Sequence, residues 1–277
     1  MSDLGLKSDR GLTVGVFDSG FGGLTVLRAL MPLLAGARFI YLGDTARLPY
    51  GSKSQETISR YAVSSARFIE DLGADMLVVA CNTATALALD DLKAELPMPV
   101  VGVIEPGAQA AASLKKDAHV LVLATSATVQ AQAYTRALRG LGLGAHEMAC
   151  PLLVPLVEEG WTDHAVTDEV LRIYLSQALE AAPATDTLLL GCTHYPLLEP
   201  AIRRVLEGLG HPLTIIDSAR ATAEATARVV AERFPALSGV GAEASFYATD
   251  SVEKFQRLGS VFLGQPVWSV GLIDLGG

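Results

Sequence analysis

Cysteine is scarce in this sequence, with three residues among 277. Domains that are stabilised by disulfides need more cysteines. A folded chain of this length buries roughly three quarters of its unfolded surface and needs no such cross-link. The N-terminal stretch MSDLGLKSDRGLT has no apolar core of the kind that directs export. Together these absences predict a cytoplasmic protein with reduced thiols.

Long apolar runs and an excess of positive charge are also absent. No uninterrupted apolar stretch reaches the roughly 18 residues of a membrane span, although the mean hydropathy is +0.36. The formal net charge of −9 argues against the basic footprint of generic nucleic-acid or anionic-membrane binding. We therefore expect no nucleic-acid partner and no membrane partner.

Cofactor motifs are missing as well. The glycine-rich turn in VFDSGFGGLTVLRAL (Val16–Leu30) lacks the Gly-Lys-Ser/Thr of a P-loop, and Thr25 stands where GxGxxG needs its last glycine. The lysines do not follow strands in a context suited to a Schiff base. They are Lys7, Lys53, Lys93, Lys115, Lys116 and Lys254. We expect no cofactor, and in particular no pyridoxal phosphate.

What the sequence does contain is a regular alternation of short apolar runs and helical patterns. The predicted strands are Thr13–Phe17, Arg38–Leu42, Met76–Ala80, Val100–Ile104, His119–Ala124, His146–Cys150, Thr187–Gly191 and Leu213–Ile216, followed by Ser245–Ala248 and Pro266–Leu272. The predicted helices are Gln55–Leu72, Thr83–Leu96, Ala127–Leu141, Ala165–Ala181, Glu199–Leu209 and Ala219–Phe234. Apolar strands spaced by helices predict a parallel α/β sheet, which binds ligands at the carboxyl ends of its strands.

An internal repeat predicts two similar α/β halves. LVVACNTATAL (Leu77–Leu87) aligns with LLLGCTHYPLL (Leu188–Leu198), which pairs Cys81 with Cys192, Asn82 with Thr193 and Thr83 with His194. Upstream, VGVFDSG near Asp18 resembles VLVLATSA near Thr125. The strand ends of the two halves could then face one another across a cleft, and Pro97–Pro99 is a plausible crossing point.

The repeated cysteines admit several interpretations. Free cysteine is often a small buried hydrophobe, which is how we interpret Cys150. Cys81 and Cys192 instead end strands before polar residues that begin helices, where a helix N-terminus stabilises a thiolate. Two such thiols on opposite sides of a cleft could remove a proton from one face of a carbon and return one to the other face. The alternatives are a zinc site with His194, for which paired CxxC or HExxH spacing is absent, and a disulfide.

Three further motifs each have a structural and a functional interpretation. The structural interpretation of Asp18 is that it caps the helix after the glycine-rich turn. The functional interpretation is that it holds a substrate ammonium or assists a thiol. The free N–H groups of the turn suit a small carboxylate. The loop YLGDTARLPYGSKS (Tyr41–Ser54) could be a plain connector capped by a serine, or could touch substrate. Glu158 and Glu159 in LVPLVEEGW could lie on the surface, or one could serve a cleft thiol or histidine.

Four motifs together, DSGFGGLTV, GDTARLPYGS, ACNTAT and GCTHYP, resemble those of the glutamate racemases in the aspartate/glutamate racemase superfamily. The resemblance covers essentially the whole chain. It implies two α/β domains related by a pseudo-twofold, with the active site between them. The first domain would comprise residues 1–103 and 217–277, and the second, inserted domain residues 104–216. It also implies cofactor-independent interconversion of L- and D-glutamate, a cell-wall role for the D-glutamate, no metal, and a homodimer.

The resemblance also assigns site residues by motif match. Cys81 and Cys192 are implied as the catalytic thiols, assisted by Asp18, His194 and Glu158. Substrate contacts are implied for Asp18, Ser19, Pro49, Tyr50, Gly51, Ser52, Asn82, Thr83, Thr125, Thr193 and His194. Our hypothesis is that Asp18 tunes Cys81, while His194, with Glu158, tunes Cys192. The rival functions are aspartate racemisation, non-catalytic amino-acid binding, and zinc-dependent hydrolysis.

Overall fold

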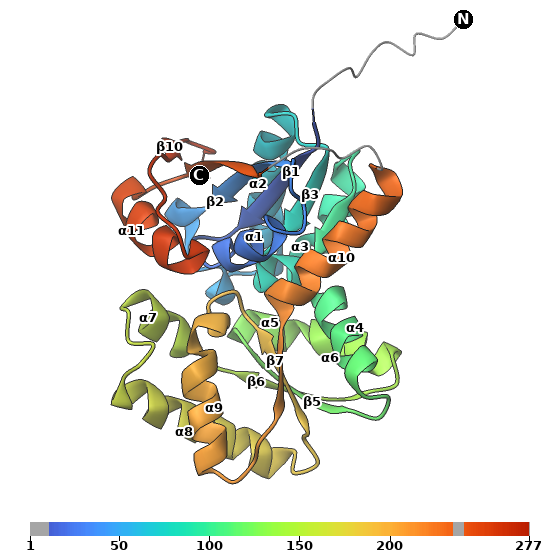
Figure 1. Ribbon diagram of the computed structural model, residues 1–277, viewed down its shortest axis with the longest axis vertical. Helices are drawn as coiled ribbons and strands as arrows, with labels where there is room; N and C mark the ends of the chain where they lie inside the picture. The colour runs from blue at the N-terminus through green and yellow to red at the C-terminus, as the bar shows by residue number, and fades with distance from the viewer. Residues whose placement is uncertain (1–10, 235–240, 277) are drawn as a thin grey trace, which may run out of the picture.

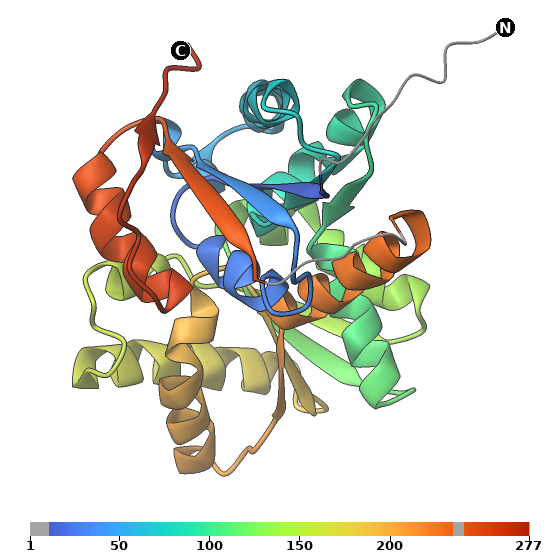
Figure 2. The same cartoon turned by 45° about the horizontal axis from the view of Figure 1, so that its top comes forward.

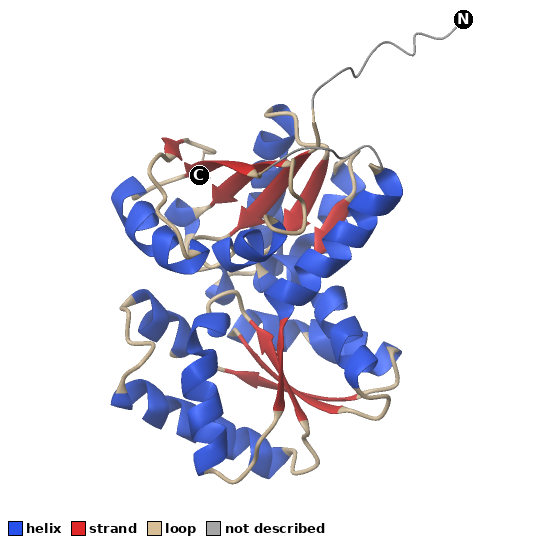
Figure 3. Ribbon diagram, in the orientation of Figure 1, coloured by secondary structure: helices blue, strands red, loops and turns tan. Residues whose placement is uncertain are grey.

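The computed structural model describes residues 11–234 and 241–276. Residues 1–10, which include Lys7 and most of the N-terminal stretch, therefore lie outside the described residues. The chain forms two parallel β-sheets, one above the other in Figure 1, and each sheet is flanked by helices (Figure 3).

The first sheet has the strand order β10-β9-β2-β1-β3-β4. Its strands are β1 (Thr13–Asp18), β2 (Arg38–Gly43), β3 (Met76–Val79), β4 (Val100–Gly102), β9 (Glu243–Ala248) and β10 (Gly271–Leu272). The helices between these strands are α1 (Leu24–Leu30), α2 (Gln55–Asp71), α3 (Asn82–Glu95) and α11 (Val252–Leu263). Every residue of β1 is buried because apolar clusters cover both faces of the sheet, one of them beneath α2 and α3. This explains the continuous apolar runs in the sequence.

The second sheet has the strand order β6-β5-β7-β8. Its strands are β5 (His119–Ala124), β6 (Gly144–Ala149), β7 (Thr187–Gly191) and β8 (Thr214–Asp217). The helices of this half are α4 (Ile104–Leu114), α5 (Ser126–Ala131), α6 (Ala133–Gly140), α7 (Leu153–Glu158), α8 (Ala165–Ala181) and α9 (Glu199–Gly208). The long helix α10 (Ser218–Arg233) follows β8 and packs against α1 and α4, so it joins the two halves.

The two sheets share one topology. The order β2-β1-β3-β4 in the first matches β6-β5-β7-β8 in the second, and each neighbouring pair is parallel. The register places Val14 beside Met76 in one half and Val120 beside Thr187 in the other, five residues before each repeated cysteine. The prediction of two similar parallel α/β domains is confirmed.

The chain passes between the halves twice. It leaves the first sheet after Gly102 and returns with β9, which lies beside β2 although the whole second sheet separates them in sequence (Figure 2). The segment Pro97–Pro99 does not cross, because it links α3 to β4 within the first half. The domain boundaries at 103/104 and 216/217 stay a prediction; β8 ends at Asp217.

Three of the predicted elements end or break differently in the structure, each for a local reason, and the helices α4 and α11 were not predicted. The helix expected over Ala127–Leu141 breaks at Gln132, which has a left-handed φ of 50°. The strand expected over Val100–Ile104 ends at Gly102, and α4 begins at Ile104. The strand expected over Pro266–Leu272 is only two residues long, because side chains of α11 form hydrogen bonds with the backbone N–H of Val267 and the carbonyl of Trp268.

No helix within the described ranges 11–234 and 241–276 is long and apolar enough to cross a bilayer.

A close approach at Gly43 holds the glycine-rich turn in place. Gly43 ends β2, and a Cβ at this position would overlap the carbonyl oxygen of Gly20. Tyr41, also on β2, donates a hydrogen bond to the same oxygen (3.1 Å). The turn therefore rests directly on the end of β2.

We predict that Gly43→Ala lowers the free energy of unfolding by about 1–3 kcal/mol, because an added methyl must displace backbone. Gly140→Ala is the matched control. It adds a methyl in α6 where no atom lies within 4 Å, so it should leave stability unchanged or raise it by about 0.5–1 kcal/mol. Urea unfolding of both variants checks this, and equal stabilities would contradict it.

Candidate active site

A pocket of about 490 Å³ lies where the carboxyl ends of both sheets meet. Its wall includes residues that follow β3 and β7, the equivalent strands of the two halves, and residues that follow β1 and β5. Ligand sites in parallel α/β folds form at such strand ends. A second cavity, of about 570 Å³ between α3, α4 and α6, contains neither repeated cysteine.

Cys81 enters the pocket from the first half and is 5% exposed. It is the N-cap residue of α3: Ala84 N–H donates to its sulfur (3.4 Å), and its thiol donates to Ser19 Oγ (3.5 Å). The expected lowering of the Cys81 pKa is wrong. Burial, reinforced by the charge of Asp18, raises the pKa of Cys81 to about 12 and outweighs the hydrogen bonds with Ser19 and Ala84.

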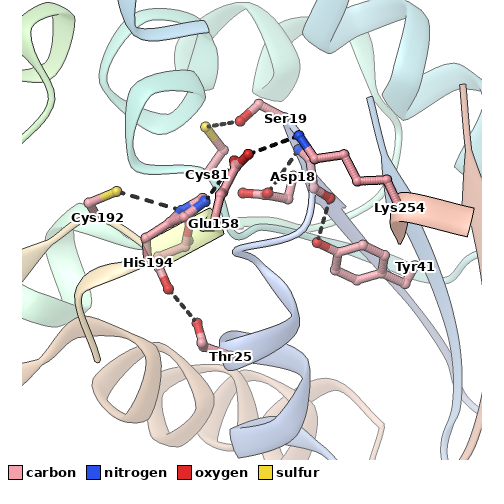
Figure 4. A network of polar contacts seen from close by, with 11 residues as sticks. Asp18, Ser19, Thr25, Tyr41, Cys81, Glu158, Cys192, His194 and Lys254 are labelled. Carbon is pink, nitrogen blue, oxygen red and sulfur yellow. Dashed lines mark hydrogen bonds and ion pairs between the residues drawn. The ribbon is translucent and has the colours of Figure 1, made fainter. Parts of the chain in front are cut away.

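Cys192 enters the pocket from the second half and is also 5% exposed. The expectation that a helix begins directly after it is wrong. Only a short 3₁₀ turn (Tyr195–Leu198) follows, and the next α-helix, α9, starts at Glu199, seven residues after Cys192. The polar neighbour of Cys192 is instead His194, whose Nδ1 lies 4.0 Å from the sulfur (Figure 4).

His194 lies between a thiol and a carboxylate. Its Nδ1 faces Cys192, and its Nε2 lies 3.3 Å from Glu158 Oε1. Burial alone would lower the pKa of His194, but hydrogen bonds and charge attraction from Cys192 and Glu158 raise it to about 10. Burial would raise the pKa of Glu158, but His194 and Lys254 hold it below its usual value. The pair is therefore an imidazolium and a carboxylate at neutral pH.

Asp18 ends β1 and lies just beneath the pocket surface, 1% exposed. Gly20 N–H donates to its Oδ2 (2.9 Å), whereas no hydrogen bond of good geometry reaches Oδ1 from the described residues. Burial raises the pKa of Asp18, although His194 and nearby backbone N–H groups oppose this. Asp18 does not cap α1, whose N-cap residue is Gly23.

Hydrogen bonds join the two halves beside the thiols. Tyr134 donates to Asn82 Oδ1 (2.6 Å), which leaves Asn82 Nδ2 buried without a partner among the described residues. The hydroxyls of Thr83 and Thr125 lie 2.9 Å apart. Thr25 Oγ donates to the carbonyl of Thr193 (3.1 Å; the bond leaving Thr25 in Figure 4).

The loop over the pocket is held by a buried carboxylate. Asp44 is fully buried and accepts hydrogen bonds from the Tyr50 hydroxyl (2.5 Å), Arg47 Nε (2.9 Å) and Thr249 Oγ (3.0 Å). These three hydrogen bonds hold the loop to Asp44 and, through Thr249, to the segment that follows β9. Ser54 caps α2, as the structural interpretation of this motif expects.

The structure brings the predicted residues together around one cavity. All of them line the pocket except Asp18, which lies behind the wall. The lining members of the prediction are Ser19, Pro49, Tyr50, Gly51, Ser52, Cys81, Asn82, Thr83, Thr125, Glu158, Cys192, Thr193 and His194. The third cysteine, Cys150, also lines this pocket, and the described residues hold no group of three or more side chains arranged to bind a metal ion.

Three residues that contact the side chains of the pocket were not predicted from the sequence. Lys254 lines the pocket and forms an ion pair with Glu158, and nothing in its local sequence marks it. Tyr134, which orients Asn82, lies in an ordinary helical pattern. Asp44 falls inside a motif that we did single out, and its place directly after a strand was the available signal.

Comparisons with known proteins identify the family of this chain. The family described as Asp/Glu/Hydantoin racemase matches residues 24–226. A glutamate racemase of Koribacter versatilis is 49% identical, with 95% of this chain and 98% of that protein covered. A glutamate racemase structure from Bacillus anthracis superposes with a TM-score of 0.87 at 37% identity, covering 95% of this chain and 98% of that one. Another from Francisella tularensis, in complex with D-glutamate, gives 0.86 at 31% identity, covering 96% and 98%. The chain therefore belongs to the Asp/Glu/Hydantoin racemase family, and within that family it groups with the glutamate racemases.

Proposed function

We propose that this protein interconverts L- and D-glutamate by acid/base chemistry of Cys81 and Cys192, without a cofactor, and that its D-glutamate serves peptidoglycan synthesis. The observation that carries the proposal is the pair of thiols entering one pocket from the two halves of the fold. The glutamate racemase relatives, one of them in complex with D-glutamate, support the choice of substrate. The cytoplasmic location and the homodimer stay predictions.

The reaction requires one thiolate and one thiol at the same moment. The thiolate takes the α-hydrogen as a proton from one face of the substrate, leaving a carbanion, and the opposite thiol donates a proton to the other face. Each turnover therefore exchanges the protonation states of the two sulfurs. The α-hydrogen is a weak acid, so the pocket must stabilise the carbanion with prealigned donors in a site that excludes water.

The surroundings of the two thiols suggest which one starts ionised. The imidazolium of His194 beside Cys192 favours negative charge on that sulfur. The pKa of about 12 keeps Cys81 protonated at neutral pH. Cys192 is then the first base and Cys81 the first acid. For the reverse direction, we propose that a substrate ammonium near Asp18 supplies the positive charge that Cys81 lacks.

The substrate has groups that match the remaining walls of the pocket. A carboxylate suits the N–H groups at the start of α3 and the free amide of Asn82. The buried carboxylate of Asp18, with one oxygen lacking a good hydrogen bond, suits the ammonium. The loop Pro49–Ser52 covers the bound molecule. These contacts are the proposed roles of the substrate-binding residues.

We predict that Cys81→Ala and Cys192→Ala each slow racemisation by about a thousandfold or more, because each removes one proton carrier. The measurement is optical rotation of L-glutamate in D₂O with metal-free and pyridoxal-free protein. Each variant should still exchange the α-hydrogen of the one enantiomer that faces its remaining thiol. Cys150→Ala, which changes another pocket cysteine, should stay within a few-fold of the wild type.

Several outcomes would overturn this function. Absence of deuterium uptake at the α-carbon would leave only amino-acid binding, and loss of activity with a chelator would revive a metal mechanism. Faster turnover of aspartate than of glutamate would change the substrate. That comparison is needed because one methylene is worth only about 1–3 kcal/mol in a pocket.

Asp18→Asn tests the tuning of Cys81. Enantiomers have equal free energies, so kcat/KM must be the same in the two directions for any variant. If Asp18 acts mainly on Cys81, kcat should fall more in one direction than in the other. KM must then also fall more in that same direction, so that kcat/KM stays equal in the two directions. Progress curves from pure L- and pure D-glutamate measure this. An equal fall of kcat in both directions would mean that Asp18 only holds substrate.

The protonation of His194 predicts a pH dependence of stability. Its pKa is about 10 in the folded protein, against 6.5 for an unperturbed histidine. A raised pKa means that the folded state binds the proton more tightly, so this stabilisation is complete below about pH 6.5 and is lost as the pH rises through about 10. Urea unfolding under reducing conditions should therefore show stability falling over this range, and falling less in His194→Gln. Parallel curves for the two proteins would contradict the assignment.

A further inference from the structure

Helix α11 of the first half reaches across the pocket to the polar groups around Cys192. Lys254 Nζ lies 3.0 Å from Glu158 Oε2, and the ring of Phe262 packs against His194 with its centroid 4.9 Å away and the planes at 74°. Figure 4 shows the lysine approaching Glu158 from the side opposite Cys192. The acid/base partners of Cys192 are thus contacted by side chains of the other half.

The two oxygens of Glu158 have different partners. Oε1 faces His194 Nε2 at 3.3 Å, and Oε2 faces Lys254 at 3.0 Å. Glu158 is the last residue of α7, a six-residue helix that ends before Gly160, which has a φ of 77°. So short an element restrains its final side chain weakly. The contacts with His194 and Lys254 therefore fix the carboxylate.

Stability does not account for the Lys254–Glu158 pair. The side chains are 43% and 18% exposed, and partly solvated ion pairs add little to folding. Their geometry is nevertheless specific. Glu159 also lines the pocket, yet Lys254 pairs with Glu158. Lys254 and His194 therefore contact the same one of the two adjacent carboxylates.

The position of Lys254 is itself constrained. The segment before α11 is anchored to the loop that covers the pocket: Thr249 donates to Asp44, and Thr45 exchanges two hydrogen bonds with Asp250 (2.6 and 2.9 Å). Lys254 follows within the first turn of the helix, and its Nζ lies 5.3 Å from the Phe21 ring centroid. The ammonium therefore projects from a rigid base.

We propose that Lys254 is a positioning residue for the Cys192 side of the reaction. It holds Glu158 against His194, and so fixes the imidazolium beside the Cys192 sulfur. The inference rests on the proposed function and deepens it, because it makes the acid/base group of one half depend on a side chain of the other. The partners of Cys192 are then correctly placed only when the two halves are together.

Lys254→Met tests this, because methionine keeps the length of the side chain and removes its charge. We expect kcat/KM for glutamate to fall about tenfold, mainly through kcat, since a misplaced acid/base group slows the chemical step. Without substrate, alkylation of Cys192 by iodoacetamide, followed by peptide mass spectrometry, should slow several-fold, because the thiolate is the nucleophile.

Two variants serve as controls. Lys254→Arg keeps a cation that can reach Glu158 and should stay within about threefold of the wild type in both measurements. Lys115→Met removes another lysine paired with a carboxylate, at 2.6 Å from Asp186, that does not line the pocket. It should change neither rate.

The two measurements separate the ways in which the inference can fail. A higher KM with unchanged kcat would mean that Lys254 binds substrate directly, and an unchanged or faster alkylation of Cys192 would mean that it does not act through His194. Either result overturns the proposal. Alkylation needs no turnover. If the wild-type protein does not racemise glutamate but Lys254→Met still slows the labelling of Cys192, the proposed function is rejected and the positioning role stands.

Discussion

Removal of water from charged groups is the constraint on which this site depends. Asp18, Cys81, Cys192 and His194 are each less than 10% exposed. Burial disfavours charge on all of them, so each charge present must be supported by a neighbour. His194 remains charged because Cys192 and Glu158 outweigh its burial, whereas Cys81, beside another acid, keeps its proton. The same dry surroundings strengthen every electrostatic contact that a bound molecule makes.

The two halves share a topology but not an electrostatic environment. The last residue of the central strand is Asp18 in one half and Ala124 in the other. The strand end that carries Cys81 leads directly into α3, whereas the one that carries Cys192 leads to His194 and a 3₁₀ turn. A symmetric scaffold thus places two sulfurs in equivalent positions, whereas the side chains around them differ: burial and the charge of Asp18 raise the pKa of Cys81, and the imidazolium of His194 lies beside Cys192. The proposed two-thiol mechanism uses this difference, because one sulfur must carry a proton while the other does not.

Much of this could be predicted from the sequence, because the relevant signals are local. Apolar runs separated by helical patterns gave the parallel sheets, and the repeat around Cys81 and Cys192 gave the two halves. The ionisation of Cys81 could not be predicted, because burial and the distance to Asp18 are set by tertiary structure. Lys254 could not be found for the same reason: its partner, Glu158, lies beside the other sheet, 96 residues earlier in the chain. The break at Gln132 depends on a backbone conformation that the helical pattern conceals.

The insertion of one half into the other has a consequence for biosynthesis. The sheet edge at β2 is completed by β9, which the ribosome makes only after the entire second sheet. Until then the nascent first half presents an unpaired strand edge, a known route to aggregation that chaperones or rapid folding of the inserted half must limit. Helix α11, which carries Lys254, is made later still. A chain released before α11 could therefore fold its second half and yet lack the ion pair between Lys254 and Glu158.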